Sequence, residues 1–197
     1  MGSQAIQGQL WGKRPGDWAS IQEKTALNCY MHVLQQHNLD DSVKLLDIGC
    51  GSGLFCDLAA ANGTKVIGID ASENLIKQAK EMNSTISFVV GEMEELPFED
   101  KSFEFITGFN SFQYAANVKN ALTEAKRVLK DNGKLVAMIW GNKEDCEAAS
   151  FLKAVGSLLP PPPPGAAGPF ALSENKLLET MLEEVGFTIV DNIDLVS

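Results

Sequence analysis

One short stretch, residues 44–55, limits the fold of this chain more than any other. It reads KLLDIGCGSGLF, an apolar run followed at once by glycines at positions 49, 51 and 53. The apolar half predicts a buried parallel strand. The glycine half predicts a turn that a ligand can approach closely, with a helix beginning near Gly53 or Leu54. Because N–H groups at a helix N-terminus are unpaired and carry partial positive charge, this arrangement indicates a nucleotide-type site.

Strand and helix patterns alternate through most of the chain. We expect strands at 43–48, 65–70, 86–90, 103–107 and 134–140, helices at 54–62, 72–82 and 118–129, and a sixth strand at 187–195. Ser72 is the expected N-cap of one helix, and Gly63 is expected to end another. This rhythm predicts an α/β fold, a Rossmann-like, doubly wound and mostly parallel sheet of about six strands with helices on both faces.

The two ends of the chain complete the expected organisation of one globular domain. Residues 1–42 are expected to form an N-terminal arm, irregular over 1–16, and a capping helix from the N-cap Asp17 to about Gln36. The apolar face of that helix is expected at Leu27, Tyr30, Met31 and Leu34. Residues 43–197 would form the ligand-binding domain. Its last third is expected to hold a helix at 145–158, a stiff proline run at 160–164, and a helix from the N-cap Ser173 to Val185.

Composition narrows the classes of partner. The 197 residues include 45% hydrophobic residues, and 16 Lys and Arg oppose 26 Asp and Glu, for a net charge of −10. Such a balance argues against nucleic acid and anionic membranes and favours a small-molecule partner. The four cysteines form no CxxC pair, which predicts no metal site and a reducing, cytoplasmic location. No apolar run is long enough for a membrane span, and the first residues show no signal pattern.

Residues around the glycine turn indicate which nucleotide-like ligand is favoured. The dinucleotide pattern GxGxxG would need a third glycine where Leu54 stands, and the Asp47 carboxylate would oppose a pyrophosphate but suit a cationic ligand. S-adenosyl-L-methionine carries a sulfonium and an ammonium and no phosphate. Asp70 ends the second strand and could accept both ribose hydroxyls, while Glu92 follows the third strand and could accept the adenine amino group.

Four motifs in order carry a family resemblance. They are LLDIGCGSG at 45–53, IGID at 67–70, GEMEELPF at 91–98 and RVLKDNGKL at 127–135. In these motifs the chain resembles the class I S-adenosylmethionine-dependent methyltransferases. The resemblance is to their small-molecule, ubiquinone/menaquinone-biosynthesis-like branch (methyltransferase type 11). It implies S-adenosyl-L-methionine as cofactor, S-adenosyl-L-homocysteine as product, and in-line transfer of a methyl group to a small-molecule acceptor.

The resemblance also implies site residues. The implied cofactor-binding set is Asp47, Gly49, Cys50, Gly51, Ser52, Asp70, Ala71, Glu92, Met93, Phe109 and Asn110. The acceptor-pocket candidates are Asn110, Gln113 and Tyr114, and the arm with Trp11 and Trp18 would close over the cofactor. The only histidines, His32 and His37, lie off the expected apolar stripe, so no general base is assigned.

The chain departs from the family pattern at its end. The family sheet has a seventh, antiparallel strand, whereas this sequence stops just after the expected sixth strand, at Ser197. An open sheet edge would follow, which predicts either a homodimer through that edge or a shortened form of a longer enzyme. Two other functions stay open. One is a truncated cofactor-binding module without turnover that acts in interactions. The other is a nicotinamide-dependent oxidoreductase, disfavoured by Leu54 and Asp47.

Overall fold

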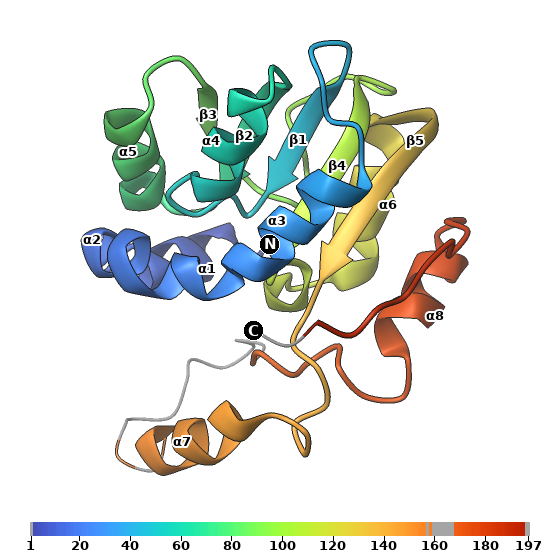
Figure 1. Ribbon diagram of the computed structural model, residues 1–197. Coiled ribbons are helices and arrows are strands. Elements are labelled where there is room, and N and C mark those ends of the chain that lie inside the picture. Colours follow the sequence, from blue (N-terminus) through green and yellow to red (C-terminus); the bar gives the residue numbers. More distant parts are fainter. Residues whose placement is uncertain (1, 157, 159–167, 196–197) are drawn as a thin grey trace.

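A parallel sheet forms the centre of the molecule. The computed structural model describes residues 2–156, 158 and 168–195 (Figure 1). The sheet has the strand order β3-β2-β1-β4-β5. Its strands are β1 (Lys44–Ile48), β2 (Lys65–Asp70), β3 (Ser87–Val90), β4 (Phe103–Phe109) and β5 (Leu129–Met138). Because the chain runs outward from β1 through β2 and β3 and then returns to β4 on the other side, the strand order reverses at β1. Open α/β sheets bind ligands beyond the carboxyl ends of their strands at such a switch point.

Helices cover both faces of the sheet, so the predicted doubly wound α/β fold is confirmed. Three helices, α3 (Leu27–Gln36), α4 (Leu54–Ala61) and α5 (Glu73–Met82), lie on one face (Figure 1). On the other face lie α6 (Val118–Val128) and α8 (Leu177–Glu184). Alternate residues of β1 point to opposite faces of the sheet. Leu45 packs on the face covered by α3, α4 and α5, and Leu46 packs on the face covered by α6 and α8; both are fully buried.

Local signals explain where two of these helices begin or end. The Ser72 side chain accepts a hydrogen bond from the N–H of Leu75, as expected of the N-cap of α5. Gly63 follows α4 with a φ of 93°, a conformation that glycine adopts without steric cost.

The expected sixth strand is wrong. Residues 187–195 form no strand, and the sheet has five strands within the described part of the chain. Phe187 and Ile189 pack against the core while Val190 is 88% exposed, so the period-2 alternation behind the prediction is present. Alternation alone does not make a strand, because a strand also needs a neighbour whose N–H and C=O groups lie in register. The fifth strand also differs from expectation, since β5 begins at Leu129 and ends at Met138.

The N-terminal arm is more helical than expected. It contains α1 (Gln4–Trp11), α2 (Pro15–Asp17), a π-helical turn η1 (Trp18–Gln22) and a 3-10 turn η2 (Glu23–Ala26) before α3. The expected apolar face of α3 was partly wrong. Cys29, Tyr30 and Val33 are buried, whereas Leu27 and Met31 are 39% and 40% exposed. Figure 1 shows α1 and α2 beneath the carboxyl ends of the strands.

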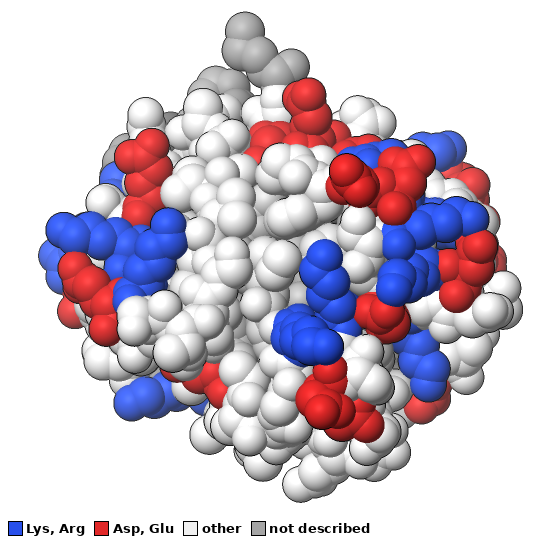
Figure 2. All heavy atoms as spheres, turned by 90° about the horizontal axis from the view of Figure 1, so that it is seen from above, with Lys and Arg blue, Asp and Glu red and all other residues white. Residues whose placement is uncertain are grey.

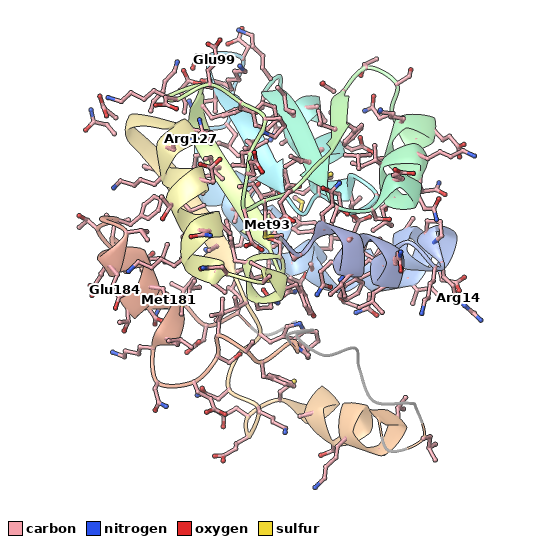
Figure 3. The ribbon with its side chains drawn as sticks, turned by 180° about the vertical axis from the view of Figure 1, so that it is seen from behind. Arg14, Met93, Glu99, Arg127, Met181 and Glu184 are labelled. Carbon is pink, nitrogen blue, oxygen red and sulfur yellow. The ribbon has the colours of Figure 1, made fainter. Side chains whose placement is uncertain are left out.

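The last third of the chain lies beside the sheet. Helix α7 (Glu147–Gly156) is shorter than expected, and the proline run at 160–164 lies outside the described residues. Ser173 does not cap a helix. Its hydroxyl donates to the Trp140 carbonyl (2.7 Å), and α8 begins at Leu177. Met181 and Glu184 of α8 (Figure 3) hold this helix to the core and to Lys119 of α6, respectively.

The surface away from the arm carries charges of both signs. Figure 2 shows basic side chains lying beside acidic ones on the face seen from above. Among the helices that the structure describes, none has the length and apolar character needed to cross a membrane.

Candidate functional site

The glycine turn after β1 is shaped by close contacts that exclude side chains. Gly49, Gly51 and Gly53 have φ values of 75°, 58° and 89°. A Cβ on Gly49 would lie 2.4 Å from the Ser111 Cβ, and one on Gly51 would lie 2.7 Å from the Trp18 Nε1. Both the backbone conformation and the lack of space therefore require glycine at this turn.

A cavity lies at the carboxyl ends of β1, β2 and β4, where these glycines meet the N-terminal arm. Its lining residues are Gln7, Trp11, Trp18, Ile48, Gly49, Gly51, Ile69, Asp70, Ala71, Leu75, Gly91, Glu92, Met93, Phe109, Asn110, Ser111 and Tyr114. It thus brings together most of the candidates from the sequence. Asp47, Cys50, Ser52 and Gln113 are not among the lining residues.

Asp47 points into the protein and away from the cavity. Its carboxylate accepts hydrogen bonds from the Thr107 hydroxyl (2.7 Å) and the Cys56 thiol (3.5 Å). Burial raises the pKa of Asp47 to about 7. The expectation that this carboxylate faces the ligand is therefore not met by the geometry.

Asp70 lies at the end of β2 and faces the cavity. Its two oxygens accept the N–H groups of Gly51 (3.0 Å) and Ser72 (2.8 Å). Burial raises the pKa of Asp70 to about 6, although these two N–H groups oppose the shift. The same carboxylate thus fixes the glycine turn and borders the space where a ligand can lie.

Glu92 and Met93 line the cavity from the loop after β3, and Figure 3 shows Met93 close to α1. The Glu92 carboxylate accepts the N–H of Gln4 (2.7 Å) and the hydroxyl of Ser3 (3.2 Å). It therefore holds the start of α1, with which it makes a favourable charge–dipole interaction. A ligand that used the same carboxylate would compete with these contacts.

The loop after β4 provides the opposite wall. Asn110 has a φ of 50°, and its N–H donates to the Met138 carbonyl (2.8 Å). Gln113 is fully buried behind the wall and donates to the Asn110 side chain (3.3 Å). Ser111, which sequence reasoning missed, lines the cavity with a buried hydroxyl that has no hydrogen-bond partner among the described residues.

The N-terminal arm covers the cavity, as the pair of tryptophans predicted. Trp11 lies edge-on to Trp18 (5.1 Å between ring centroids) and to Tyr114 (5.2 Å), and all three line the cavity. Burial raises the pKa of Tyr114 to about 12. The remaining cavity measures about 70 Å³. Ligand sites usually enclose about 300–1,000 Å³, so a nucleotide-sized ligand needs the arm to shift outward.

Glu23 is a second residue that sequence reasoning missed. It is 3% exposed, and its carboxylate accepts the N–H of Ser52 (3.0 Å) and, in a short hydrogen bond, the hydroxyl of Ser52. Burial raises the pKa of Glu23, while the N–H groups and hydroxyl that face it act in the opposite direction. Its neighbours Gln22, Lys24 and Thr25 are also polar, so no local pattern distinguished Glu23 from a solvent-exposed acid.

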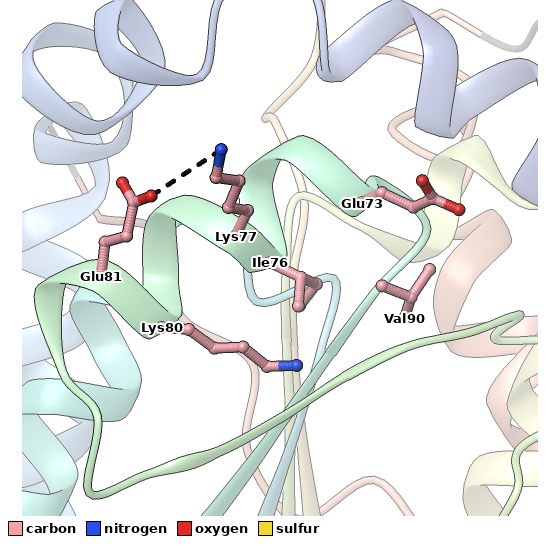
Figure 4. A pocket seen from close by; sticks show the side chains of 6 residues that line it. All are labelled: Glu73, Ile76, Lys77, Lys80, Glu81 and Val90. Carbon is pink, nitrogen blue, oxygen red and sulfur yellow. Dashed lines mark ion pairs between the residues drawn. The ribbon is translucent and has the colours of Figure 1, made fainter.

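A larger hollow of about 310 Å³ lies elsewhere, between α5 and the outer strand β3 (Figure 4). It is lined by Glu73, Ile76, Lys77, Lys80, Glu81 and Val90. Long, exposed side chains border it, and Lys77 and Glu81 pair across one turn (4.0 Å). This open groove lacks the buried polar groups that orient a ligand, so the cavity at the switch point is the better candidate site. Within the described residues no group of His, Cys, Asp and Glu could hold a metal ion.

Comparisons with known proteins agree with this geometry. Residues 46–137 match the methyltransferase domain family. The malonyl-[acyl-carrier protein] O-methyltransferase of Erwinia pyrifoliae is 31% identical over 108 residues, which cover 55% of this chain and 41% of the relative. The demethylmenaquinone methyltransferase of Staphylococcus aureus is 33% identical over 112 residues, which cover 54% of this chain and 46% of the relative. The chain thus spans less than half the length of these two relatives.

The fold itself has well-matched solved structures. The [4+2]-cyclase SpnF superposes with a TM-score of 0.72 over 96% of this chain and 74% of its own chain, at 22% identity. The fold is that of a Rossmann-like domain, and the cavity lies at its switch point. Residues 46–137 match a methyltransferase domain, in agreement with the resemblance of the sequence motifs to class I S-adenosylmethionine-dependent methyltransferases.

Proposed function

We propose that this protein transfers a methyl group from S-adenosyl-L-methionine to a small-molecule acceptor. The observation that carries the proposal is one cavity lined by the glycine turn, by Asp70, by Glu92 with Met93, and by Phe109 with Asn110. Each group ends a different strand, and together they offer the acidic, amide and apolar surfaces that an adenosyl-sulfonium ligand needs.

The residues present fit this cofactor. Asp70 would hold the ribose hydroxyls, with Ala71 beside it, and Glu92 and Met93 would meet the adenine. Gly49 and Gly51 would border the methionine end. The unpartnered Ser111 hydroxyl offers a further hydrogen bond in the same cavity. Among the described residues no Lys, Arg or His lines it, which suits a ligand with positive groups and no phosphate.

Positioning is the main task of the protein in this reaction. When bound, S-adenosyl-L-methionine supplies an activated methyl group whose leaving group is a neutral thioether. Trp11, Trp18 and Tyr114 would then exclude water and hold the acceptor in line, which can lower the barrier by several kcal/mol. With its pKa at about 12, Tyr114 stays protonated at neutral pH and would donate a hydrogen bond rather than act as a base. Asn110 could orient the acceptor from the opposite wall.

Two measurements test the proposal. Calorimetry should show binding of S-adenosyl-L-homocysteine to the wild type and binding weakened tens-fold in Asp70→Ala, because a charge-assisted hydrogen bond contributes about 1.5–3 kcal/mol. Asp131→Ala, which removes an exposed carboxylate far from the cavity, serves as the control. An unchanged affinity in Asp70→Ala would refute the ribose assignment.

A cofactor-binding module without turnover is the second candidate. The fold alone does not decide between the two candidates, since one fold can carry different functions. Transfer of a radiolabelled methyl group to a panel of small acceptors separates the two candidates. Labelled product from any acceptor supports the enzyme, whereas cofactor binding without product throughout the panel supports the module. The cytoplasmic location, the lack of a nucleic-acid partner and the homodimer remain predictions from the sequence.

A further inference from the structure

The Glu23 carboxylate lies at the N-terminus of α4, next to the glycine turn. The unpaired N–H groups at such a helix end attract anions. The N-cap residue of α4 is Gly53, which has no side chain to accept the first N–H groups of the helix. Glu23 reaches this position from a segment 29 residues earlier in the chain and accepts the N–H and hydroxyl of Ser52. The chain thus fills with its own carboxylate the place where related α/β folds bind a phosphate.

The Glu23 carboxylate lies next to Gly51, one of the residues that line the cavity. A Cβ on Gly51 would lie 2.8 Å from the Glu23 Oε1, while the N–H of the same glycine donates to Asp70 (3.0 Å). The two carboxylates therefore flank one residue of the turn. Glu23 does not itself line the cavity, but its carboxylate lies directly behind Gly51, which does. A ligand anchored on Asp70 and extended along the turn would therefore lie close to the Glu23 carboxylate.

We propose that Glu23 is a specificity-determining residue that excludes nucleotides with phosphate groups from this cavity and favours a ligand that carries an ammonium group instead. The inference rests on the proposed function, because it concerns the same cavity. The sequence suggested Asp47 as the carboxylate that disfavours a phosphate, but the Asp47 carboxylate points toward Thr107 and Cys56. We assign this role to Glu23 instead. In the part of the chain that the structure describes, the lining contains no Lys, Arg or His that could pair with a phosphate.

The test compares the binding of ADP and of S-adenosyl-L-homocysteine by calorimetry. In the wild type we expect binding of S-adenosyl-L-homocysteine and at least tenfold weaker binding of ADP. Glu23→Ala uncovers the helix N-terminus, so ADP should bind at least tenfold more tightly than in the wild type, while S-adenosyl-L-homocysteine binds more weakly. Glu23→Gln keeps the shape and a carbonyl acceptor for the Ser52 N–H. It should raise the ADP affinity severalfold even if the alanine variant does not fold.

Glu73→Ala is the matched control, because it removes an exposed carboxylate from the first turn of the neighbouring helix α5. It should leave the ADP affinity unchanged. The proposal is overturned if folded Glu23 variants bind ADP no better than the wild type, or if Glu73→Ala gains as much. Absence of S-adenosyl-L-homocysteine binding in the wild type would refute the proposed function instead, and the ADP comparison would still decide the role of Glu23.

Discussion

At the scale of single residues, the buried acids around the glycine turn differ in what they can do. Asp47 and Asp70 both follow from the sequence motifs, yet only Asp70 lines the cavity. The side chain of Asp47 is 60 residues away in sequence from its partner Thr107, a contact that only the pairing of β1 with β4 creates. Neighbouring carboxylates on adjacent strands can therefore have separate roles, one in the core and one at the site.

Cofactor affinity should depend on pH through Asp70. Burial raises its pKa to about 6, and the ionised form accepts ribose hydroxyls better than the neutral form. Affinity for S-adenosyl-L-homocysteine should thus be constant above that pKa and fall as the pH drops through about 6. The limit is about tenfold per pH unit if only the ionised form binds. Calorimetry between pH 4.5 and 8 measures this, and an Asp70→Asn variant should lose most of the dependence. Affinity that rises toward low pH would contradict the prediction.

At the scale of elements, the N-terminal arm is the segment that would have to move for a nucleotide-sized ligand to enter the cavity. Its contacts are specific: Asn74 donates to the Gly12 carbonyl (2.8 Å), and the Glu92 carboxylate accepts from Ser3 and Gln4. The Glu23 carboxylate adds two buried hydrogen bonds to Ser52, and two tryptophans pack over the strand ends. Segments that cover ligand sites typically open by breaking such a limited set of contacts.

Ligand binding should therefore change tryptophan fluorescence. Trp11 and Trp18 line the cavity, whereas the third tryptophan, Trp140, lies beside Phe170 (6.1 Å between ring centroids). Titration with S-adenosyl-L-homocysteine should alter the emission of the wild type, and Trp11→Phe should reduce the response. The matched Trp140→Phe variant should keep the response in full. A flat signal with calorimetrically confirmed binding would argue against movement of the arm.

Arg127 of α6 should stabilise the loop that carries Glu92 and Met93. Its guanidinium forms ion pairs with Glu124 and Asp100 (2.7 Å each), and it donates to the carbonyls of Leu96 and Phe98. Arg127→Ala should lower the free energy of unfolding by about 1.5–3 kcal/mol, measured by urea denaturation. Arg14→Ala, which breaks an exposed pair with Asp17, should cost less than about 1 kcal/mol. Equal losses in the two variants would contradict this role.

At the scale of the whole molecule, buried acids link folding to pH. Burial raises the pKa of Asp47 to about 7 and of Asp70 to about 6, and it also raises the pKa of Glu23. Between the ordinary pKa of an aspartate and these values, the folded protein binds protons that the unfolded chain has released. Each such group therefore lowers stability as the pH rises, by up to about 1.4 kcal/mol per pKa unit. The net charge of −10 acts in the same direction.

The ligand-free protein should thus resist urea better at pH 5.5 than at pH 8. Asp47→Asn should reduce the difference, because burial raises the pKa of Asp47 further than that of Asp70, and Asp47 does not line the cavity. Asp131→Asn, at an exposed position, should leave the difference unchanged. Higher stability at pH 8 in the wild type would contradict the assignment of these buried acids.

The outer strands of the sheet bear on whether the protein forms a homodimer. Within the described residues β3 and β5 are the outer strands, because residues 187–195 add no strand beside β5. The homodimer expected from an open edge therefore remains a prediction, which light scattering across a range of protein concentrations can test.

Local sequence patterns predicted the succession of strands and helices up to β5, the glycine turn, and the acidic residues at the strand ends. These features are local, since apolar periodicity, capping residues and glycines act within a few residues of chain. The prediction of a sixth strand at 187–195 was wrong, because strand formation also depends on a partner that is distant in sequence.

The set of side chains that share the cavity depends on tertiary packing. β1 pairs with β4, and Asp47 is thereby bound within the core rather than at the ligand. The arm folds back over the strand ends, which brings Trp11 and Trp18 to the cavity and the Glu23 carboxylate to the start of α4. No local pattern encodes these contacts, because each joins residues far apart in the chain and depends on the packing of whole elements.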